Sequence, residues 1–311
     1  MTLLLLLTTF AYAASPKDCA PCHKAETSAF EQAGMTRALS AATATQTDLA
    51  TQLGGYSYRI AGDTYIVSDG KETLSVPLQW VFGQGTTGQT YVFQRDGRWY
   101  ESRVSWFAAL HGLDLTIGMQ NITPHNLTEA AGRLASMSEI NKCFDCHATG
   151  VTKTDLSHLI PGVQCERCHG ATTAHLANNA PMRKLSATSA EEMSDFCGQC
   201  HRTWSDIAAN GPRGILNIRF QPYRLALSKC YDVSDNRIRC TSCHDPHRAV
   251  QTSAAAYDGK CLACHASKPC RNGQTTNCVS CHMPKLELPG AHKKFTDHKI
   301  RIVKAHEPYP D

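Results

Sequence analysis

The sequence predicts a fold of mostly short α-helices and irregular loops, interrupted by one inserted antiparallel β-meander. A pentapeptide of the form Cys-x-x-Cys-His occurs seven times in the 311 residues. Six of the seven copies fall within the 140 residues from Cys143 to His282, whereas 124 residues separate Cys19 of the first copy from Cys143 of the second. So little chain for each copy leaves room only for short helices and loops, while the long interval leaves room for a separate module.

The seven pentapeptides, numbered motif 1 to motif 7 along the chain, account for 14 of the 16 cysteines. They comprise Cys19, Cys22 and His23; Cys143, Cys146 and His147; Cys165, Cys168 and His169; Cys197, Cys200 and His201; Cys240, Cys243 and His244; Cys261, Cys264 and His265; and Cys278, Cys281 and His282. Two thiols three positions apart on a helical turn reach the two vinyl groups of one porphyrin, and the adjoining histidine is the proximal ligand of its iron. Zinc ribbons and thioredoxin-like sites also use Cys-x-x-Cys, but neither needs the histidine that follows here every time. The sequence therefore predicts seven covalently bound haems of the c type.

The N-terminal residues 1–13 have the pattern of a signal peptide. An apolar run from Leu3 to Leu7 precedes Ala11-Tyr12-Ala13, which has the small residues of a cleavage site, and we expect cleavage after Ala13. This run is too short to span a bilayer, and no other segment approaches transmembrane length. We therefore expect a secreted protein, periplasmic or extracellular. The net charge of +4 is weak and argues against a nucleic-acid partner.

The spacing of the motifs divides the mature chain into three parts. Residues 14–50 form a segment with one haem, residues 51–118 a β-rich module without haem, and residues 119–311 a hexahaem domain. Within residues 54–106, apolar residues alternate with polar ones, and Asp69-Gly70 and Asp96-Gly97 are typical of hairpin turns. We interpret residues 54–106 as an antiparallel β-meander of about five strands.

The hexahaem domain is expected to use its porphyrins as core. Only 42% of the residues are hydrophobic and 7% aromatic, which is modest material for large apolar cores. Six haems in 140 residues cannot each be enclosed separately. Neighbouring haems must therefore stack against one another, with only a few residues of the chain around each haem.

Whether the sixth coordination position of each iron is occupied or open distinguishes an electron carrier from an enzyme. Eight histidines lie outside the motifs: His111, His125, His158, His175, His247, His292, His298 and His306. This number permits bis-histidine ligation of nearly all seven irons. The alternative is that some of the eight are surface residues. The candidate distal ligands are His125, His158, His175, His247, His292 and His298, together with Met35 for the first haem. Methionine ligation would raise the potential of that haem, and the alternative is that Met35 only packs in the core.

Three segments resemble one family of bacterial cytochromes. Residues 162–170 (GVQCERCHG) with His175, residues 240–247 (CTSCHDPH) and residues 278–285 (CVSCHMPK) are similar to multihaem cytochromes related to the tetrahaem cytochrome of ammonia oxidisers and to octahaem hydroxylamine oxidoreductase. Residues 296–300 (TDHKI) resemble the ending of such domains in large multihaem proteins.

The resemblance covers residues 17–34 and about 143–303, and it implies particular ligands. Histidines placed like His175, His247 and His298 are commonly distal ligands in that family. The chain departs from the pattern at Met35, where the family often has a histidine. The β-rich module is not part of the ammonia-oxidiser cytochrome and inherits nothing from it.

Three functions are open on these grounds. The first is electron transfer through seven haems, between redox partner proteins or to an extracellular electron acceptor. The second is a homopolymer that conducts electrons outside the cell, in which one subunit donates a distal histidine to the next; motif 1 near the N-terminus and His292, His298 and His306 near the C-terminus permit it. The third is an oxidoreductase that acts on a small nitrogen compound at one open haem, and no catalytic residue is assigned for it.

Cys230 and Cys270 are the two cysteines outside the motifs. In an oxidising compartment a disulfide between them is favoured, and a packed thiol is the alternative.

Overall fold

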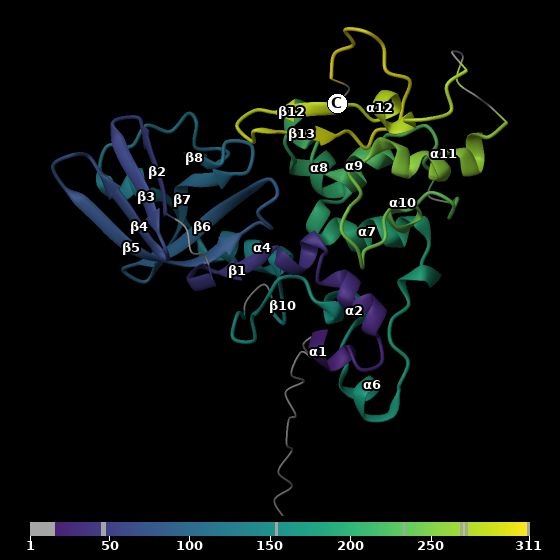
Figure 1. Cartoon of the computed structure of the whole chain (residues 1–311), viewed down its shortest axis with the longest axis horizontal. Helices are drawn as coiled ribbons and strands as arrows, with labels where there is room; N and C mark the ends of the chain where they lie inside the picture. The colour runs from purple at the N-terminus through teal and green to yellow at the C-terminus, as the bar shows by residue number, and fades with distance from the viewer. Residues whose placement is uncertain are drawn as a thin grey trace, which may run out of the picture.

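The computed structural model describes residues 16–44, 48–152, 155–232, 234–267, 270 and 273–309. The expected signal peptide, residues 1–13, lies outside the described residues. Figure 1 shows a curved β-sheet beside an elongated region of short helices. The helical region extends from α1 (Pro16–Cys19) and α6 (Thr173–Asn178) at one end to α12 (Cys278–His282) at the other.

The described residues form a nine-stranded antiparallel sheet in which β2 to β8 follow one another in chain order. Its strands are β1 (Leu39–Ala41), β2 (Asp48–Leu53), β3 (Tyr56–Ala61), β4 (Thr64–Ser68), β5 (Thr73–Phe82), β6 (Gly88–Arg95), β7 (Arg98–Phe107), β8 (Gly112–Leu115) and β9 (Gly132–Ala135). Strand β1 pairs with β5, and β9 pairs with β7. The sheet curls, which brings β2 close to β8.

This sheet is larger than the five-stranded meander that the alternation in residues 54–106 predicts. Strands β1 and β9 have three and four residues, too few for a pattern, and they pair with partners distant in sequence. The turn at Asp96-Gly97 is where we expected it, and both residues have positive φ, 49° and 71°. Arg95 pairs with Arg98 across it, as in a two-residue hairpin with a primed turn.

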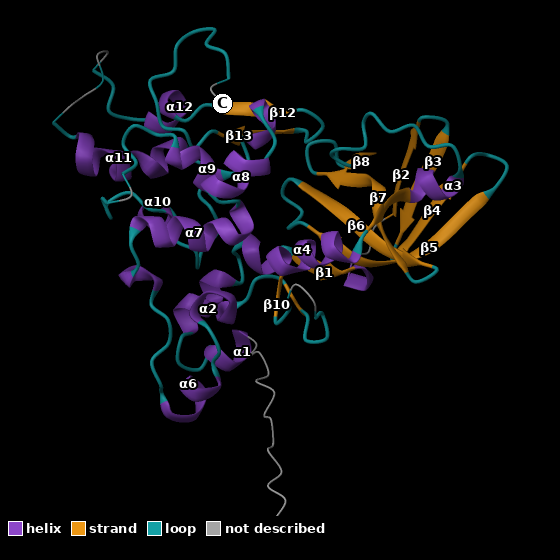
Figure 2. Ribbon diagram, turned by 180° about the vertical axis from the view of Figure 1, so that it is seen from behind, coloured by secondary structure: helices purple, strands orange, loops and turns teal. Residues whose placement is uncertain are grey.

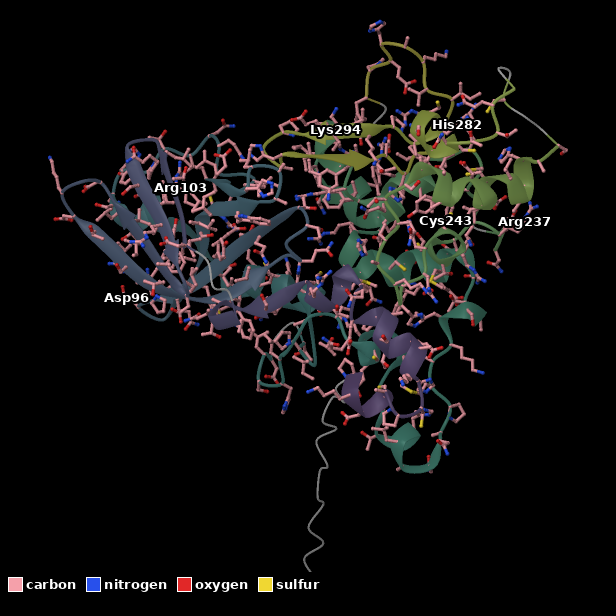
Figure 3. The ribbon with its side chains drawn as sticks, in the orientation of Figure 1. Asp96, Arg103, Arg237, Cys243, His282 and Lys294 are labelled. Atoms are coloured by element: carbon pink, nitrogen blue, oxygen red, sulfur yellow. The ribbon has the colours of Figure 1, made fainter. Side chains whose placement is uncertain are left out.

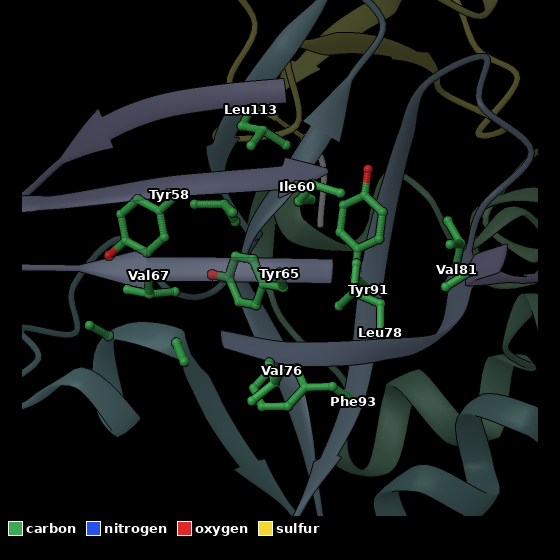
Figure 4. Close-up of a cluster of buried hydrophobic side chains, with 14 residues drawn as sticks. Tyr58, Ile60, Tyr65, Val67, Val76, Leu78, Val81, Tyr91, Phe93 and Leu113 are labelled. Atoms are coloured by element: carbon green, nitrogen blue, oxygen red, sulfur yellow. The ribbon is translucent and has the colours of Figure 1, made fainter. Parts of the chain in front are cut away.

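The concave side of the sheet holds the largest apolar cluster of the described residues. Tyr58 and Ile60 from β3, Tyr65 from β4 and Phe93 from β6 are almost fully buried there, and Figure 4 shows their side chains facing one another. The rings of Phe93 and Tyr100 stack with centroids 5.3 Å apart. The β-rich part therefore has a core of its own.

Short helices and small hairpins make up the rest (Figure 2). The α-helices are α1 and α6 as above, α2 (Lys24–Phe30), α3 (Leu127–Ala131), α4 (Met137–His147), α5 (Cys165–His169), α7 (Ala190–His201), α8 (Trp204–Asn210), α9 (Gln221–Ala226), α10 (Cys240–Cys243), α11 (Asp258–His265) and α12 as above. The 3-10 helices are η1 (Gly34–Arg37), η2 (Ala42–Ala44), η3 (Leu185–Ala187), η4 (Gly214–Asn217) and η5 (Ala254–Tyr257). Two hairpins pair β10 (Ala148–Thr149) with β11 (Ile160–Pro161), and β12 (Lys285–Leu288) with β13 (Lys293–Thr296).

A second apolar cluster joins α4 to the sheet. Phe144 of α4 is 1% exposed and lies edge-on to Trp80 of β5 and Trp99 of β7, with ring centroids 5.8 and 6.0 Å apart. Because α4 ends in motif 2, this packing fixes motif 2 against the sheet. No helix in the described ranges is long and apolar enough to cross a membrane.

Candidate functional site

Each Cys-x-x-Cys-His motif lies on a turn of helix. Helices α4, α5, α7, α11 and α12 each end at the histidine of their motif, and α10 ends one residue before it. In motif 1 the amide of His23 donates to the carbonyl of Cys19 over 2.9 Å, which makes the same turn. The two thiols of each pair are therefore one helical turn apart.

Three of the motif histidines have one ring nitrogen held by a backbone carbonyl. The Nδ1 atoms of His147, His169 and His282 lie 2.9, 3.2 and 2.8 Å from the carbonyl oxygens of Ala38, Arg183 and Arg301. Since a carbonyl oxygen can only accept, Nδ1 carries the proton and Nε2 keeps its lone pair. A hydrogen bond of this kind orients a histidine that binds a metal.

Three motif histidines face a histidine from outside the motifs. The ring centroids of His23 and His175 are 6.2 Å apart, those of His169 and His247 are 5.9 Å apart, and those of His244 and His298 are 6.2 Å apart. The Nδ1 atoms of His175 and His298 lie 2.9 and 3.0 Å from the carbonyl oxygens of Ala180 and Thr296, so each again keeps Nε2 as acceptor.

This arrangement fits haem iron. Two imidazoles that share a metal, each with a metal–nitrogen distance of about 2 Å, place their ring centres about 6 Å apart. The three observed separations agree with that value.

Burial keeps several of these histidines neutral. It lowers the pKa of His298 to about 4, and it also lowers the pKa of His147, His201 and His244. A neutral imidazole is the form that binds a metal. Ligation by these groups therefore needs no loss of a proton at neutral pH.

The thiols of different motifs meet in pairs. Hydrogen bonds between thiols raise the pKa of Cys146, through Cys200, and that of Cys197, through Cys240. Other thiols lie near enough to influence one another's pKa: Cys19 and Cys165, Cys168 and Cys200, Cys243 and Cys261, and Cys261 and Cys278. The motifs therefore lie in the spatial order 1, 3, 4, 5, 6 and 7, with motif 2 beside motif 4.

A buried ion pair, which the sequence analysis did not predict, fixes the backbone near His298 and near the carbonyl that holds His282. The Arg224 guanidinium donates two hydrogen bonds to the Asp297 carboxylate, of 2.9 and 3.0 Å, and both side chains are 0% exposed. Arg301 adds a third bond to Asp297, of 2.7 Å. Burial alone would raise the pKa of Asp297, but these guanidinium groups and a backbone amide lower it. The pair fixes the segment that carries His298 and the Arg301 carbonyl.

Other candidate ligands lie elsewhere. His292 Nε2 is 2.8 Å from a carboxylate oxygen of Asp114, so that nitrogen is already engaged. His125 is exposed beside α3, and His158 is exposed near Asp155, whose pKa it helps to lower. None of these three histidines is paired with a motif histidine in the ring contacts of the described residues, and their role as distal ligands stays a prediction.

Ligation by Met35 stays a prediction; in the structure it is the ring of His175 that faces His23. The backbone of Met35 is fixed by its own contacts: Met35 lies in η1, and its carbonyl accepts a hydrogen bond of 2.9 Å from the amide of Val163.

Cys230 and Cys270 are both free thiols, so the predicted disulfide is not formed. Burial, and to a smaller extent Cys264, raises the pKa of the Cys230 thiol, whereas Cys270 Sγ lies 4.0 Å from Nε2 of His282.

Comparison with known proteins agrees with this chemistry. Residues 115–170, which include motifs 2 and 3, match the family model for cytochrome c554 and c-prime. That match supports a c-type cytochrome. The comparison with curated proteins finds no match. The crystal structure of the outer cell wall cytochrome OcwA is similar with a TM-score of 0.40 and 18% identity, over 61% of this chain and 37% of that one. The chain thus spans less than half the length of that protein.

Proposed function

We propose that this chain carries seven covalent c-type haems and transfers electrons through them, in the periplasm or outside the cell. The observation that carries the proposal is that three motif histidines each face a second histidine at the separation that one shared iron requires. Bound haem supplies a one-electron couple at each iron. The residues of the chain hold, orient and tune it.

The proposed axial pairs are His23 with His175, His169 with His247, and His244 with His298. In each pair both axial positions are occupied by a side chain of the protein. A haem in that state exchanges electrons without binding a small molecule, which favours a carrier over a catalyst.

The proposed path of the electrons follows the contacts between motifs. Haems attached at neighbouring cysteines would lie close to one another, so electrons would pass along the order 1, 3, 4, 5, 6 and 7, with haem 2 as a branch at haem 4. Figure 3 places His282 of motif 7 beyond Cys243 of motif 5, toward the end opposite α1. Haems 1 and 7 would then be the ends of the main path, where redox partner proteins or an extracellular acceptor would exchange electrons, and haem 2 would end the branch.

The β-rich part has a supporting role in this proposal. The carbonyl of Ala38 holds Nδ1 of His147, and the ring of Phe82 lies edge-on to His147 with centroids 5.2 Å apart. Both residues belong to the sheet or border it. The sheet therefore orients the proximal histidine of haem 2.

Low-temperature EPR and absorption spectra of the oxidised protein, recorded with and without nitrite and hydroxylamine, test the proposal. The paired imidazole planes are inclined by 33°, 15° and 40°. Planes this close to parallel split the iron d orbitals, so we expect rhombic low-spin signals from these three haems, unchanged by either compound. A high-spin signal that shifts when nitrite or hydroxylamine is added would instead favour the oxidoreductase.

A further inference from the structure

His282 of motif 7 faces a different partner from the paired histidines described above. Its Nδ1 lies 2.8 Å from the carbonyl oxygen of Arg301 and so carries the proton. Its Nε2 lies 4.0 Å from Sγ of Cys270. A thiol from outside every motif therefore faces the nitrogen that would bind iron.

The separation fits a metal between the two atoms. Metal–nitrogen distances of about 2.0 Å and metal–sulfur distances of about 2.3 Å place the nitrogen and the sulfur about 4.3 Å apart when they bind opposite sides of a metal. The observed 4.0 Å is close to that sum. This is the same relation that the three histidine pairs show, with sulfur in place of the second imidazole.

The surroundings of Cys270 leave its thiol available for this role. Cys270 is exposed, and the nitrogen that its sulfur approaches is Nε2 of His282. The amide of Gly273 donates a 2.8 Å hydrogen bond to the Cys270 carbonyl, which holds the backbone at this point. Asp258 accepts bonds of 2.7 and 2.9 Å from the amides of Asn277 and Cys278, which fixes the start of α12 on the other side.

We propose that Cys270 is the sixth ligand of the iron carried by motif 7. The proposal rests on the proposed function, because it requires a haem at His282. On binding, the thiol releases its proton to water and the thiolate sulfur donates an electron pair to ferric iron, whose oxidation state does not change. An anionic ligand stabilises the ferric state, so haem 7 has a lower potential than the bis-histidine haems.

The test compares the wild-type holoprotein with Cys270→Ser, Cys270→His and the matched control Cys230→Ser, which removes the other cysteine outside the motifs. EPR and near-infrared magnetic circular dichroism are recorded on each oxidised protein. We expect a thiolate-ligated low-spin signal from one haem in seven in the wild type and in Cys230→Ser. Cys270→Ser loses that signal and gains a high-spin haem, whereas Cys270→His replaces it with a bis-imidazole signal.

Intact mass spectrometry of each protein separates the possible failures. Seven haems without a thiolate signal in the wild type, or a signal that survives in Cys270→Ser, overturn the role of Cys270. A disulfide between Cys230 and Cys270 in the holoprotein overturns it too. A wild type without haem at motif 7 overturns the proposed function itself. If Cys270→Ser fails to retain haem 7, Cys270→His decides: an unchanged thiolate signal there contradicts the proposal, and conversion to a bis-imidazole signal supports it.

Discussion

Individual side chains set the state of each iron in this account, and the pair His23 and His175 is the simplest case. Replacing His175 with alanine removes the imidazole that faces His23. We predict that one haem becomes high-spin and binds added imidazole, while the total number of haems is unchanged. The measurement is EPR with an imidazole titration.

His125→Ala is the matched control for that substitution, because His125 is exposed and lies beside α3. Its spectrum should equal that of the wild type. A wild-type spectrum from His175→Ala as well would refute the assignment of His175.

The buried ion pair between Arg224 and Asp297 gives a second prediction for single residues. Asp297→Asn removes one partner and leaves the Arg224 guanidinium buried without its countercharge, so we expect a loss of about 3–5 kcal/mol in the free energy of unfolding. Denaturant unfolding of the holoprotein measures it. Asp48→Asn breaks an exposed pair with Arg59 and should change stability little. Equal losses from the two substitutions would contradict the structural role of Asp297.

Some residues of the candidate site could be predicted from the sequence, and others could not. The pentapeptides predict the attachment sites because thioether chemistry requires that spacing, and resemblance singled out His175, His247 and His298. The pairing of these histidines depends on contacts across up to 152 positions, from His23 to His175, and no local pattern encodes such contacts. Arg224 and Asp297 are 73 positions apart and were missed for the same reason. A disulfide was favoured for Cys270 because the sequence contains only two cysteines outside the motifs, and their number says nothing about the distance between them.

Helix α4 links the sheet to motif 2, and its N-terminal cap is the prediction at the scale of elements. The Ser136 hydroxyl accepts a 3.2 Å hydrogen bond from the Glu139 amide, and the Glu139 carboxylate accepts one of 2.9 Å from the Ser136 amide. Ser136→Ala should cost about 1 kcal/mol of unfolding free energy. Ser253, at the start of η5, makes no such bond, so Ser253→Ala should cost much less.

The same cap predicts a dependence on pH. The bond from the Ser136 amide, followed by that from Arg133, lowers the pKa of Glu139 to about 2 from its ordinary 4.5. Because the folded-state pKa is the lower one, the stabilisation is present above pH 4.5 and is lost as the pH falls toward 2. Glu139→Gln should therefore flatten the acid limb of the stability curve. A limb that is equally steep in the variant would contradict this origin.

The sheet illustrates what alternation can and cannot predict for whole elements. Strands β3 and β4 have buried positions at every second residue, and β6 has a buried apolar run from Tyr91 to Phe93; all three lie within residues 54–106, where alternation suggested strands. Strand β2 alternates only between exposed and half-buried residues, and it was not expected. Its place in the sheet comes from pairing with β3 along six residues, from Asp48 with Ala61 to Leu53 with Tyr56.

At the scale of the whole molecule, the histidine contacts bear on assembly. The filament alternative relied on C-terminal histidines donated to a neighbouring subunit. His298 faces His244 and His292 contacts Asp114 within the same chain. We therefore predict that analytical ultracentrifugation of the holoprotein shows a species with the mass of one chain and its haems. Long polymers that dissociate when His306 is replaced by alanine would contradict this prediction.

If seven haems in contact exchange electrons, a reductive titration of the purified holoprotein with counted electrons reaches every one of them. The α-band absorbance of the haems is followed as reductant is added anaerobically. The account predicts an uptake of seven electrons per chain, one for each motif, with all haems reduced by a single external donor. An uptake of fewer than seven electrons, or haems that the donor cannot reach, would contradict it.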